Sequence, residues 1–288
     1  SGIGPAYAER LLADQFSYNF FATLDYASQI RVALKYIAEN DAGARVGYFG
    51  PGGTLTSDPM GGPIPNYAES LDIEFDSEPI IMPHTASSAT SQMQEARTRD
   101  WDYAVYHGIA APYNLIVQAR ADIFPELKTA STTWCVDESW LAETPELYED
   151  QIWVSGFKTL AEARSAGSKG ADAVDSALTE YRNPDNPEVA NLQYVRGFIH
   201  ALMLRQGIHN AMDAGLDPSK GQNIRQGLLE IDDWSVWGLS EPFTLDENDR
   251  RPTMRGRVYT ASDGELNHEQ TMELPRNMDW IEYWNENL

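Results

Sequence analysis

Few residues of this sequence have types and spacing that could do chemistry, and none of them completes a known motif. A glycine-rich run, Gly50 to Thr56, follows a predicted strand, where a phosphate-binding loop would lie. No Gly-Lys-Ser/Thr follows it and the G-x-G-x-x-G spacing is broken, so a loop that offers backbone N–H groups and hydroxyls to a small polar ligand fits better. The five histidines show no metal-ligand spacing and no G-x-S-x-G is present, so neither a metal site nor a serine hydrolase is indicated.

Two other features resemble parts of sites. Cys135 is the only cysteine, which excludes an intrachain disulfide, and it lies just after a predicted strand, where a nucleophile could sit. A lone cysteine is more often a buried structural residue. The acidic run Asp246 to Asp249 resembles part of a calcium loop but lacks the glycine and the terminal glutamate of that motif, so we expect a solvated turn.

The remaining signal is a set of aromatic and polar residues at predicted strand ends. These residues are Tyr106, His107, Tyr113 and Trp134. If their strands are neighbours, they face one crevice and provide a stacking surface with a few hydrogen-bonding tips.

The elements that would position these residues are short apolar strands about 25 residues apart, separated by helical patterns, which is typical of a parallel α/β sheet. The predicted strands span 45–49, 78–82, 103–106, 129–133 and 151–154, and the predicted helices span 27–39, 63–71, 88–97 and 111–121. Ligands bind such sheets at the carboxyl ends of the strands. The loops there are 50–62, 84–87, 107–112 and 134–138, where we expect function to reside.

The remaining segments have a different pattern. Residues 1–13 predict a loop and a short helix, and 18–23 an aromatic strand. A boundary is expected near Phe157, followed by polar helix over 158–182, a turn at 183–187 and one long amphipathic helix over 190–214. The tail from Trp234 to Leu288 is predicted to be rich in strands and turns, with Asp263-Gly264 joining strands at 257–261 and 269–273 as a hairpin.

Charge excludes two classes of partner. The chain has 288 residues with 44 acidic and 21 basic side chains, a formal net charge of −23, which argues against binding to nucleic acid or to anionic membranes. The excess of acid fits either a salt-adapted surface or an ordinary acidic secreted protein. No apolar run reaches the roughly 20 residues of a membrane span and no signal sequence opens the chain, which begins at Ser1 and so is expected to be a processed or truncated product.

The order of segments along the chain resembles the type I periplasmic substrate-binding proteins of ABC transporters, in the branched-chain amino acid and amide group. The resemblance covers essentially the whole chain. It rests on Ser1 to Gly4, Phe20 to Tyr26, Leu34 to Glu39, Arg45 to Phe49, Ser57 to Pro65, Asp100 to Gly108, Gly156-Phe157, Tyr194 to Phe198 and Ser262 to Leu266.

The resemblance implies an α/β fold with two Rossmann-like lobes, each with a parallel central sheet, that close on a ligand by a hinge. It places 1–24 and 155–253 in lobe 1, 25–154 in lobe 2, and 254–288 as a crossing strand and a C-terminal segment on lobe 2. Relatives carry roughly a hundred more residues before the equivalent of Ser1, enough for half a domain, so lobe 1 is expected to be incomplete.

The resemblance also implies ligand-binding residues. Ser1 and Gly2 match a loop that binds an anionic group, Tyr26 lies at the first crossing, and Met60 stands where relatives often have Tyr or Phe. Ile109 matches a ligand-facing aromatic position. The expected set is completed by Thr54, His107, Ala110, Thr133, Trp134 and Asp137.

Thr133 stands where amino-acid binders place a carboxylate for the ammonium group, and the nearest acids are Asp137 and Glu138. Because a buried ammonium without an anion is costly, an amide, a carboxylate or an aromatic acid fits better than an ordinary amino acid.

The resulting hypothesis is a monomeric, extracytoplasmic solute-binding protein, periplasmic or extracellular. It would capture a small polar molecule in the interlobe cleft and deliver it to an ABC permease, without catalysis, metal or cofactor. Two alternatives are the ligand-sensing domain of a receptor or regulator and an α/β enzyme acting on a small polar substrate.

Overall fold

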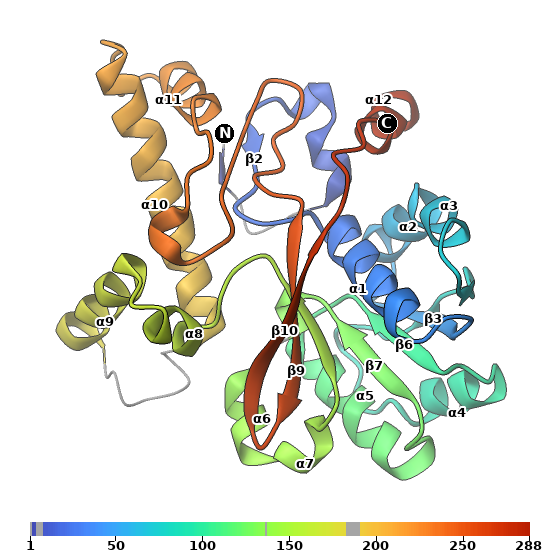
Figure 1. The fold of residues 1–288 in the computed structure, drawn as a ribbon. Coiled ribbons are helices and arrows are strands. Elements are labelled where there is room, and N and C mark those ends of the chain that lie inside the picture. The colour runs from blue at the N-terminus through green and yellow to red at the C-terminus, as the bar shows by residue number, and fades with distance from the viewer. Residues whose placement is uncertain (1, 4–7, 136, 183–190) are drawn as a thin grey trace. The chain divides into compact units, whose positions relative to one another are not determined.

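The computed structural model describes residues 2–3, 8–135, 137–182 and 191–288, so the predicted turn at 183–187 lies outside the described residues. Contacts divide the chain into two compact units (Figure 1). Unit 1 comprises residues 1–25, 156–255 and 275–288, and unit 2 comprises 26–155 and 256–274. The segment from 275, expected on the second lobe, thus clusters with unit 1, where α12 (Asp279–Asn287) contacts the 3-10 helix η1 (Glu9–Leu12).

Unit 2 is built on an eight-stranded sheet with the order β10-β9-β8-β7-β6-β3-β4, in which β5 also pairs with β3. The strands from β8 to β4 pair in parallel, and β9 joins antiparallel to β8. The strands are β3 (Arg45–Gly50), β4 (Glu74–Phe75), β5 (Ile80–Ile81), β6 (Tyr103–Tyr106), β7 (Lys128–Ser131), β8 (Ile152–Ser155), β9 (Arg255–Ser262) and β10 (Glu265–Glu273). The predicted parallel α/β sheet is confirmed.

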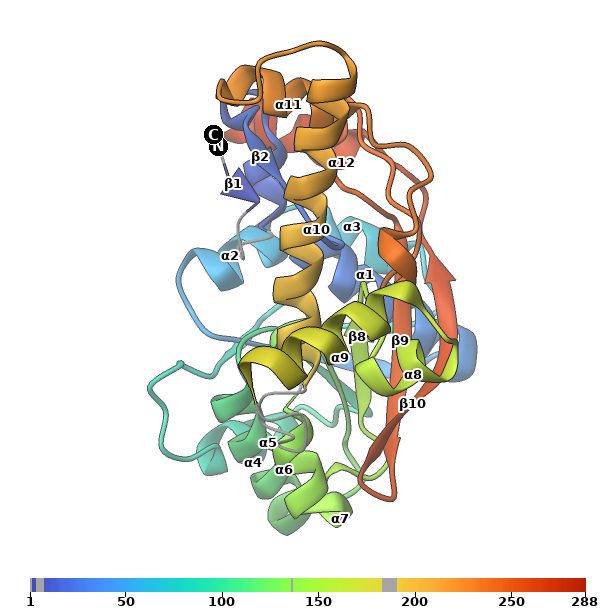
Figure 2. The same ribbon diagram turned by 90° about the vertical axis from the view of Figure 1, so that its left-hand side faces the viewer.

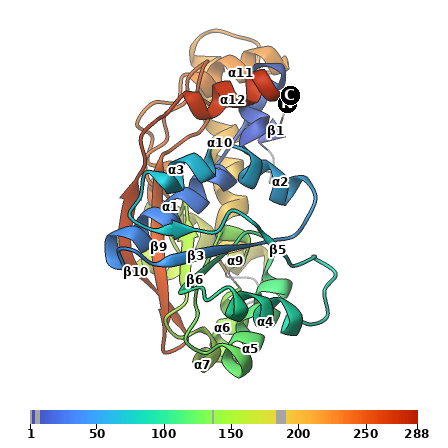
Figure 3. The same ribbon diagram turned by 90° about the vertical axis from the view of Figure 1, so that its right-hand side faces the viewer.

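Helices cover both faces of this sheet, as parallel crossovers require. Figure 3 shows α1 and α3 on one face and α4 and α5 on the other. The helices are α1 (Tyr26–Asn40), α2 (Thr54–Gly61), α3 (Ile64–Glu69), α4 (Thr90–Thr98), α5 (Ala110–Ile123), α6 (Glu138–Glu143) and α7 (Pro145–Tyr148), with the 3-10 helix η3 (Thr133–Cys135). The central strands are buried on both sides, with every residue of β6 and β8 buried, so the sheet forms a rigid floor for the loops at its edge.

One loop prediction was wrong. Residues 50–62 were expected to be irregular, but α2 begins at Thr54 and includes Pro59. The threonines and the proline in this stretch disfavour a helix, and α2 is only eight residues long, ending two residues after Pro59.

Unit 1 is mainly helical. Its elements are β1 (Gly2–Ile3), η1, η2 (Asp14–Phe16), β2 (Asn19–Phe20), α8 (Leu160–Ser165), α9 (Lys169–Tyr181), α10 (Leu192–Asp213), α11 (Gly221–Leu229), η4 (Val236–Gly238) and α12. Figure 2 shows α11 against the C-terminal part of α10. The two helices approach closely at Gly207 and Gly227, where a Cβ on Gly227 would lie 2.0 Å from the Gly207 carbonyl oxygen. The predicted long helix over 190–214 is confirmed for its described part.

In the C-terminal part of the chain, the predicted hairpin is confirmed, whereas one helix was not predicted. The hairpin β9–β10 turns at Asp263 and Gly264, whose φ angles of 52° and 80° are those of a type I′ turn. Helix α12 was not predicted, although Trp280, Ile281 and Trp284 are buried at helical spacing.

Candidate functional site

The four loops singled out in the sequence leave the sheet at one edge because the strands are in register. Phe49 of β3 pairs with Tyr106 of β6, and Tyr106 pairs with Ser131 of β7. Ile80 of β5 pairs with Phe49 from the other side. The segments after these strands therefore start level with one another.

These segments, together with Tyr26, line an open pocket of about 160 Å³ whose lining residues all belong to unit 2. We call it the strand-end pocket. It is lined by Tyr26, Leu55, His84, His107, Gly108, Ile109 and Trp134. Each of the four loops contributes at least one residue. Of the four residues expected to face one crevice, His107 and Trp134 line the pocket, whereas Tyr106 and Tyr113 are fully buried and stack on each other.

An aromatic wall forms one side of the pocket. The Trp134 Nε1–H donates a hydrogen bond of 3.0 Å to the Tyr26 hydroxyl. The rings of Tyr26 and His107 lie 4.4 Å apart, centre to centre, at an angle of 47°. Because each ring contacts the next, the wall is held in place before any ligand arrives.

His107 is the buried polar group of the pocket, with only 2% of its surface exposed. Its Nδ1 lies 3.1 Å from the Thr132 hydroxyl oxygen. Burial, with a smaller contribution from the neighbouring His84, lowers the pKa of His107 to about 3. The imidazole is therefore neutral near pH 7, able to donate from one nitrogen and accept at the other. His84 is exposed.

Two helices begin beside the pocket without a side-chain cap. Ile109 is the N-cap residue of α5 and Gly53 that of α2, and neither offers a side-chain hydrogen bond to its helix. Leu55, in the first turn of α2, lines the pocket. Gly108 makes close packing possible, because a Cβ there would lie 2.0 Å from the Tyr106 hydroxyl oxygen.

The structure brings some of the expected ligand-binding residues together and separates others. Tyr26, His107, Ile109 and Trp134 line the pocket, and Thr54 and Ala110 are the first residues of α2 and α5 beside it. Met60, Thr133 and Asp137 are not among its lining residues. Gly2 pairs with Asn19 in unit 1, and Ser1 lies outside the described residues.

Two of the separated residues have structural partners. Thr133 is fully buried, and its hydroxyl donates to the Val154 carbonyl at 3.2 Å while its N–H donates to the Gln29 side chain at 3.0 Å. The Asp137 carboxylate accepts from the backbone N–H and the hydroxyl of Ser139 at the start of α6. Both side chains are thus engaged in holding local structure.

Leu55, His84 and Gly108 line the pocket but were not singled out as binding residues. All three lie in or beside the loops named by the strand-end rule, which was the available signal. What the sequence could not show is that Leu55 sits on a helix rather than in a loop and is therefore held at the rim.

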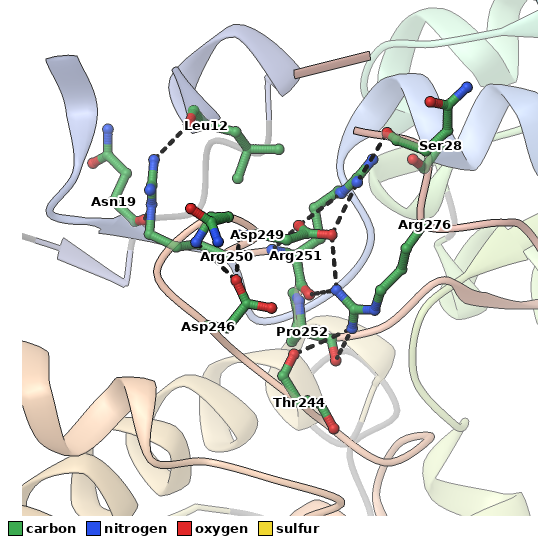
Figure 4. Close-up of polar contacts among 12 residues, drawn as sticks. Leu12, Asn19, Ser28, Thr244, Asp246, Asp249, Arg250, Arg251, Pro252 and Arg276 are labelled. Carbon is green, nitrogen blue, oxygen red and sulfur yellow. Dashed lines mark hydrogen bonds and ion pairs between the residues drawn. The ribbon is translucent and has the colours of Figure 1, made fainter. Parts of the chain in front are cut away.

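The acidic run of residues 246–249 is structural. Asp246 accepts from the N–H groups of Asn248 and Asp249, forming the expected turn. The expectation that this turn is solvated was wrong for Asp249, which is 3% exposed at its side chain and pairs with Arg251 and Arg276 (Figure 4). Within the part of the chain that the structure describes, no group of three or more His, Cys, Asp or Glu could hold a metal ion.

Cys135 is expected to be unreactive in the folded protein. It is buried, and burial raises the pKa of its thiol to about 12, so almost no thiolate exists near pH 8. We expect iodoacetamide to alkylate Cys135 far more slowly in native protein than in protein unfolded by guanidinium, as followed by mass spectrometry. Fast alkylation of the native protein would contradict this prediction and would favour a role for Cys135 as a nucleophile.

None of the helices in the described part of the chain is long and apolar enough to span a membrane. Sequence comparison matched no family model and no curated protein.

Comparison with solved structures gave strong similarity. A branched-chain amino acid ABC transporter protein from Thermus thermophilus with bound valine matches with a TM-score of 0.81 at 14% identity, over 94% of this chain and 71% of that one. An ABC transporter substrate-binding protein from Aeropyrum pernix matches with a TM-score of 0.81 at 19% identity, over 98% of this chain and 73% of that one. A solute-binding protein from R. palustris in complex with benzoate matches with a TM-score of 0.72 at 12% identity, over 92% of this chain and 68% of that one. The chain therefore has the type I periplasmic binding protein fold.

Proposed function

We propose that this chain is a solute-binding protein that captures a small molecule and presents it to an ABC permease. The observation that carries the proposal is the strand-end pocket, which joins an aromatic wall to a buried neutral imidazole at the ligand-binding edge of the sheet. Solved structures with this fold include proteins with bound valine and with benzoate, which supports a small-molecule ligand.

The proposal includes a location outside the cytoplasm, periplasmic or extracellular, because that is where a permease would receive its solute. The strongly acidic composition, with a net charge of −23, is compatible with such a location in saline surroundings. Catalysis has less support, since the one buried thiol has a raised pKa and the imidazole beside the pocket has a lowered one.

The first test is a thermal-shift screen of the protein against amino acids, amides, urea, aliphatic acids and aromatic acids at low and high salt. A ligand that binds only the folded state stabilises it by about 2.7 kcal/mol at a hundred times its Kd. A shift that grows with ligand concentration, with the ligand recovered unchanged, supports the proposal. Conversion of the ligand would support the enzyme alternative, and a folded protein that responds to no member of the panel would argue against solute binding.

Replacing the aromatic wall should weaken binding of any solute found in that screen. Trp134→Ala removes the largest ring of the pocket and the donor to the Tyr26 hydroxyl. Loss of an aromatic anchor costs about 2 kcal/mol, so we expect binding that is weaker by about tenfold to a hundredfold in isothermal titration calorimetry.

Trp140→Ala is the matched control. Trp140 is half-buried on α6 and is not among the residues lining the pocket, so its loss should leave the affinity nearly unchanged. Equal losses in the two variants would show that the effect of Trp134→Ala comes from general destabilisation, and unchanged affinity in both would place the solute elsewhere.

A further inference from the structure

The strand-end pocket has one end suited to negative charge. Helix α5 is 14 residues long and begins at Ala110, directly after Gly108 and Ile109, which line the pocket. No side chain caps its first turn. The first N–H groups of a helix lack partners within the helix and carry partial positive charge, so an anion placed there is stabilised. In α5 these donors are the N–H groups of Ala110 and Ala111, because Pro112 has none.

His107 gives an independent indication of a ligand at the same end. Only 2% of the surface of His107 is exposed, and the residue lines the pocket. Its Nδ1 contacts the Thr132 hydroxyl, whereas Nε2 has no hydrogen bond to any described residue. Because His107 lines the pocket and its Nδ1 is engaged by Thr132, Nε2 is the nitrogen that can bond a ligand oxygen.

The protonation of His107 is compatible with this role. Burial keeps the ring neutral, so only one nitrogen carries hydrogen. The Thr132 hydroxyl can rotate to donate to Nδ1, which leaves the hydrogen on Nε2. His107 would then act as a donor toward a ligand oxygen.

The rest of the pocket is apolar and lacks a counter-charge for a cation. Trp134, Leu55 and Ile109 contribute rings and aliphatic groups. Among the described residues that line the pocket, none is Asp, Glu, Lys or Arg. Thr133, which stands where amino-acid binders place a carboxylate, donates to the Val154 carbonyl instead. The ammonium group of an amino acid would therefore have no anion here.

We propose that the strand-end pocket binds an apolar monocarboxylate, with its carboxylate at the first turn of α5 and at His107 Nε2, and its apolar body against Trp134 and Leu55. The inference rests on the proposed function and narrows it to one ligand class. It differs from the expectation in which Ser1 and Gly2 receive the anionic group, because the anion is assigned to unit 2.

The first experiment compares benzoate with benzamide by isothermal titration calorimetry on the whole chain. The two probes have the same ring and differ in charge. Because hydrogen bonds to a charged group are stronger than those between neutral groups, we expect benzoate to bind about tenfold more tightly than benzamide. L-Valine, which has an ammonium group as well as a carboxylate, should bind more weakly than benzoate.

Ala110→Pro removes one donor at the first turn of α5 with little cost to the helix. Proline is favourable at the first helical position, and Ile109 has the extended φ of −122° and ψ of 165° that a residue before proline adopts. We expect the melting temperature without ligand to be retained and the preference for benzoate over benzamide to fall severalfold. Gly221→Pro, at the first position of α11 in unit 1, is the matched control and should leave benzoate binding unchanged.

A second pair of variants tests the imidazole nitrogen. The amide of His107→Gln reaches the position of Nε2, and the amide of His107→Asn reaches that of Nδ1. Benzoate binding should be retained better by His107→Gln than by His107→Asn, with both variants checked for folding by circular dichroism.

The outcomes separate this inference from the proposed function. Equal affinity for benzoate and benzamide, or a preference that Ala110→Pro leaves intact, would overturn the inference while solute binding stands. Binding of L-valine without binding of benzoate would do the same. A folded protein that binds neither these probes nor any member of the wider screen would overturn both.

Discussion

Asp249→Asn should destabilise the protein by about 3–5 kcal/mol, the cost of breaking a buried ion pair by removing one partner. Asp249 Oδ1 accepts from Arg251 Nε at 2.8 Å, and Asp249 Oδ2 accepts from Arg251 Nη2 and from Arg276 Nη1, each at 2.9 Å (Figure 4). The Arg251 side chain has no exposed surface, so the variant removes the carboxylate bonded to a buried charge and leaves only the weaker electrostatic contributions of Asp25 and Glu9. Urea unfolding followed by circular dichroism measures the change in unfolding free energy.

The matched control is Asp175→Asn in the same unit. The Asp175 carboxylate also accepts hydrogen bonds from two nitrogens of one arginine, Arg164. However, the side chains of Asp175 and Arg164 are 40% and 43% exposed. An exposed pair contributes at most about 1 kcal/mol, so we expect a much smaller effect. Similar losses in the two variants would contradict the argument that burial makes the cluster of Asp249, Arg251 and Arg276 (the Asp249 cluster) important for stability.

The effect of Asp249→Asn should also depend on pH. Burial alone would raise the pKa of Asp249, but hydrogen bonds and charges from Arg251 and Arg276 outweigh burial and hold the pKa below its ordinary value. A carboxyl whose pKa is depressed in the folded state stabilises the protein fully above its pKa in the unfolded state, which is about 4. This stabilisation is lost as the pH falls through the pKa of the folded state. The difference between wild type and Asp249→Asn should therefore be full at pH 7 and shrink below about pH 4.

The Asp249 cluster also shows where sequence reasoning stops. The turn at 246–249 could be predicted because acidic residues accept local N–H groups. Its burial could not, because that depends on Arg276, which lies 27 residues further along the chain. Local pattern indicates which groups can cap a turn, whereas burial depends on long-range packing.

The pocket was more predictable than the cluster because it follows from topology. Strand spacing indicated a parallel sheet, and a parallel sheet brings the strand ends to one edge, so each of the four loops named from the sequence contributes to the pocket. Individual residues were harder to assign. Thr133 was placed in the site by resemblance, but whether a side chain at a strand end faces the pocket or the core depends on backbone details that spacing does not specify.

A wrong secondary-structure assignment has the same origin. The stretch 50–62 has weak helix propensity, yet α2 forms there and contacts α3. Tertiary contacts of this kind override intrinsic preference, particularly for helices of about two turns, whose stability comes mostly from packing.

Gly108→Ala should both destabilise the protein and impair the strand-end pocket. The added Cβ would lie 2.0 Å from the Tyr106 hydroxyl oxygen and 2.3 Å from Cζ. The Tyr106 ring is fully buried and stacks on Tyr113 at 5.7 Å, so it has little freedom to move. Overpacking of this kind costs about 1–3 kcal/mol, and because the backbone beside His107 and Ile109 must shift, we expect solute affinity to fall by about tenfold.

Two further variants make this prediction specific. Gly61→Ala, at the last residue of α2, adds a Cβ with no atom within 4 Å and should be neutral or slightly stabilising, since alanine favours helix over glycine by about 1 kcal/mol. Tyr106→Phe removes the nearest clashing atom, so in a double-mutant cycle Gly108→Ala should cost less in the Tyr106→Phe background than in wild type. Additive losses in that cycle would show that the contact with Tyr106 is not what requires glycine at position 108, and the coupling between core packing and pocket geometry argued from it would fail.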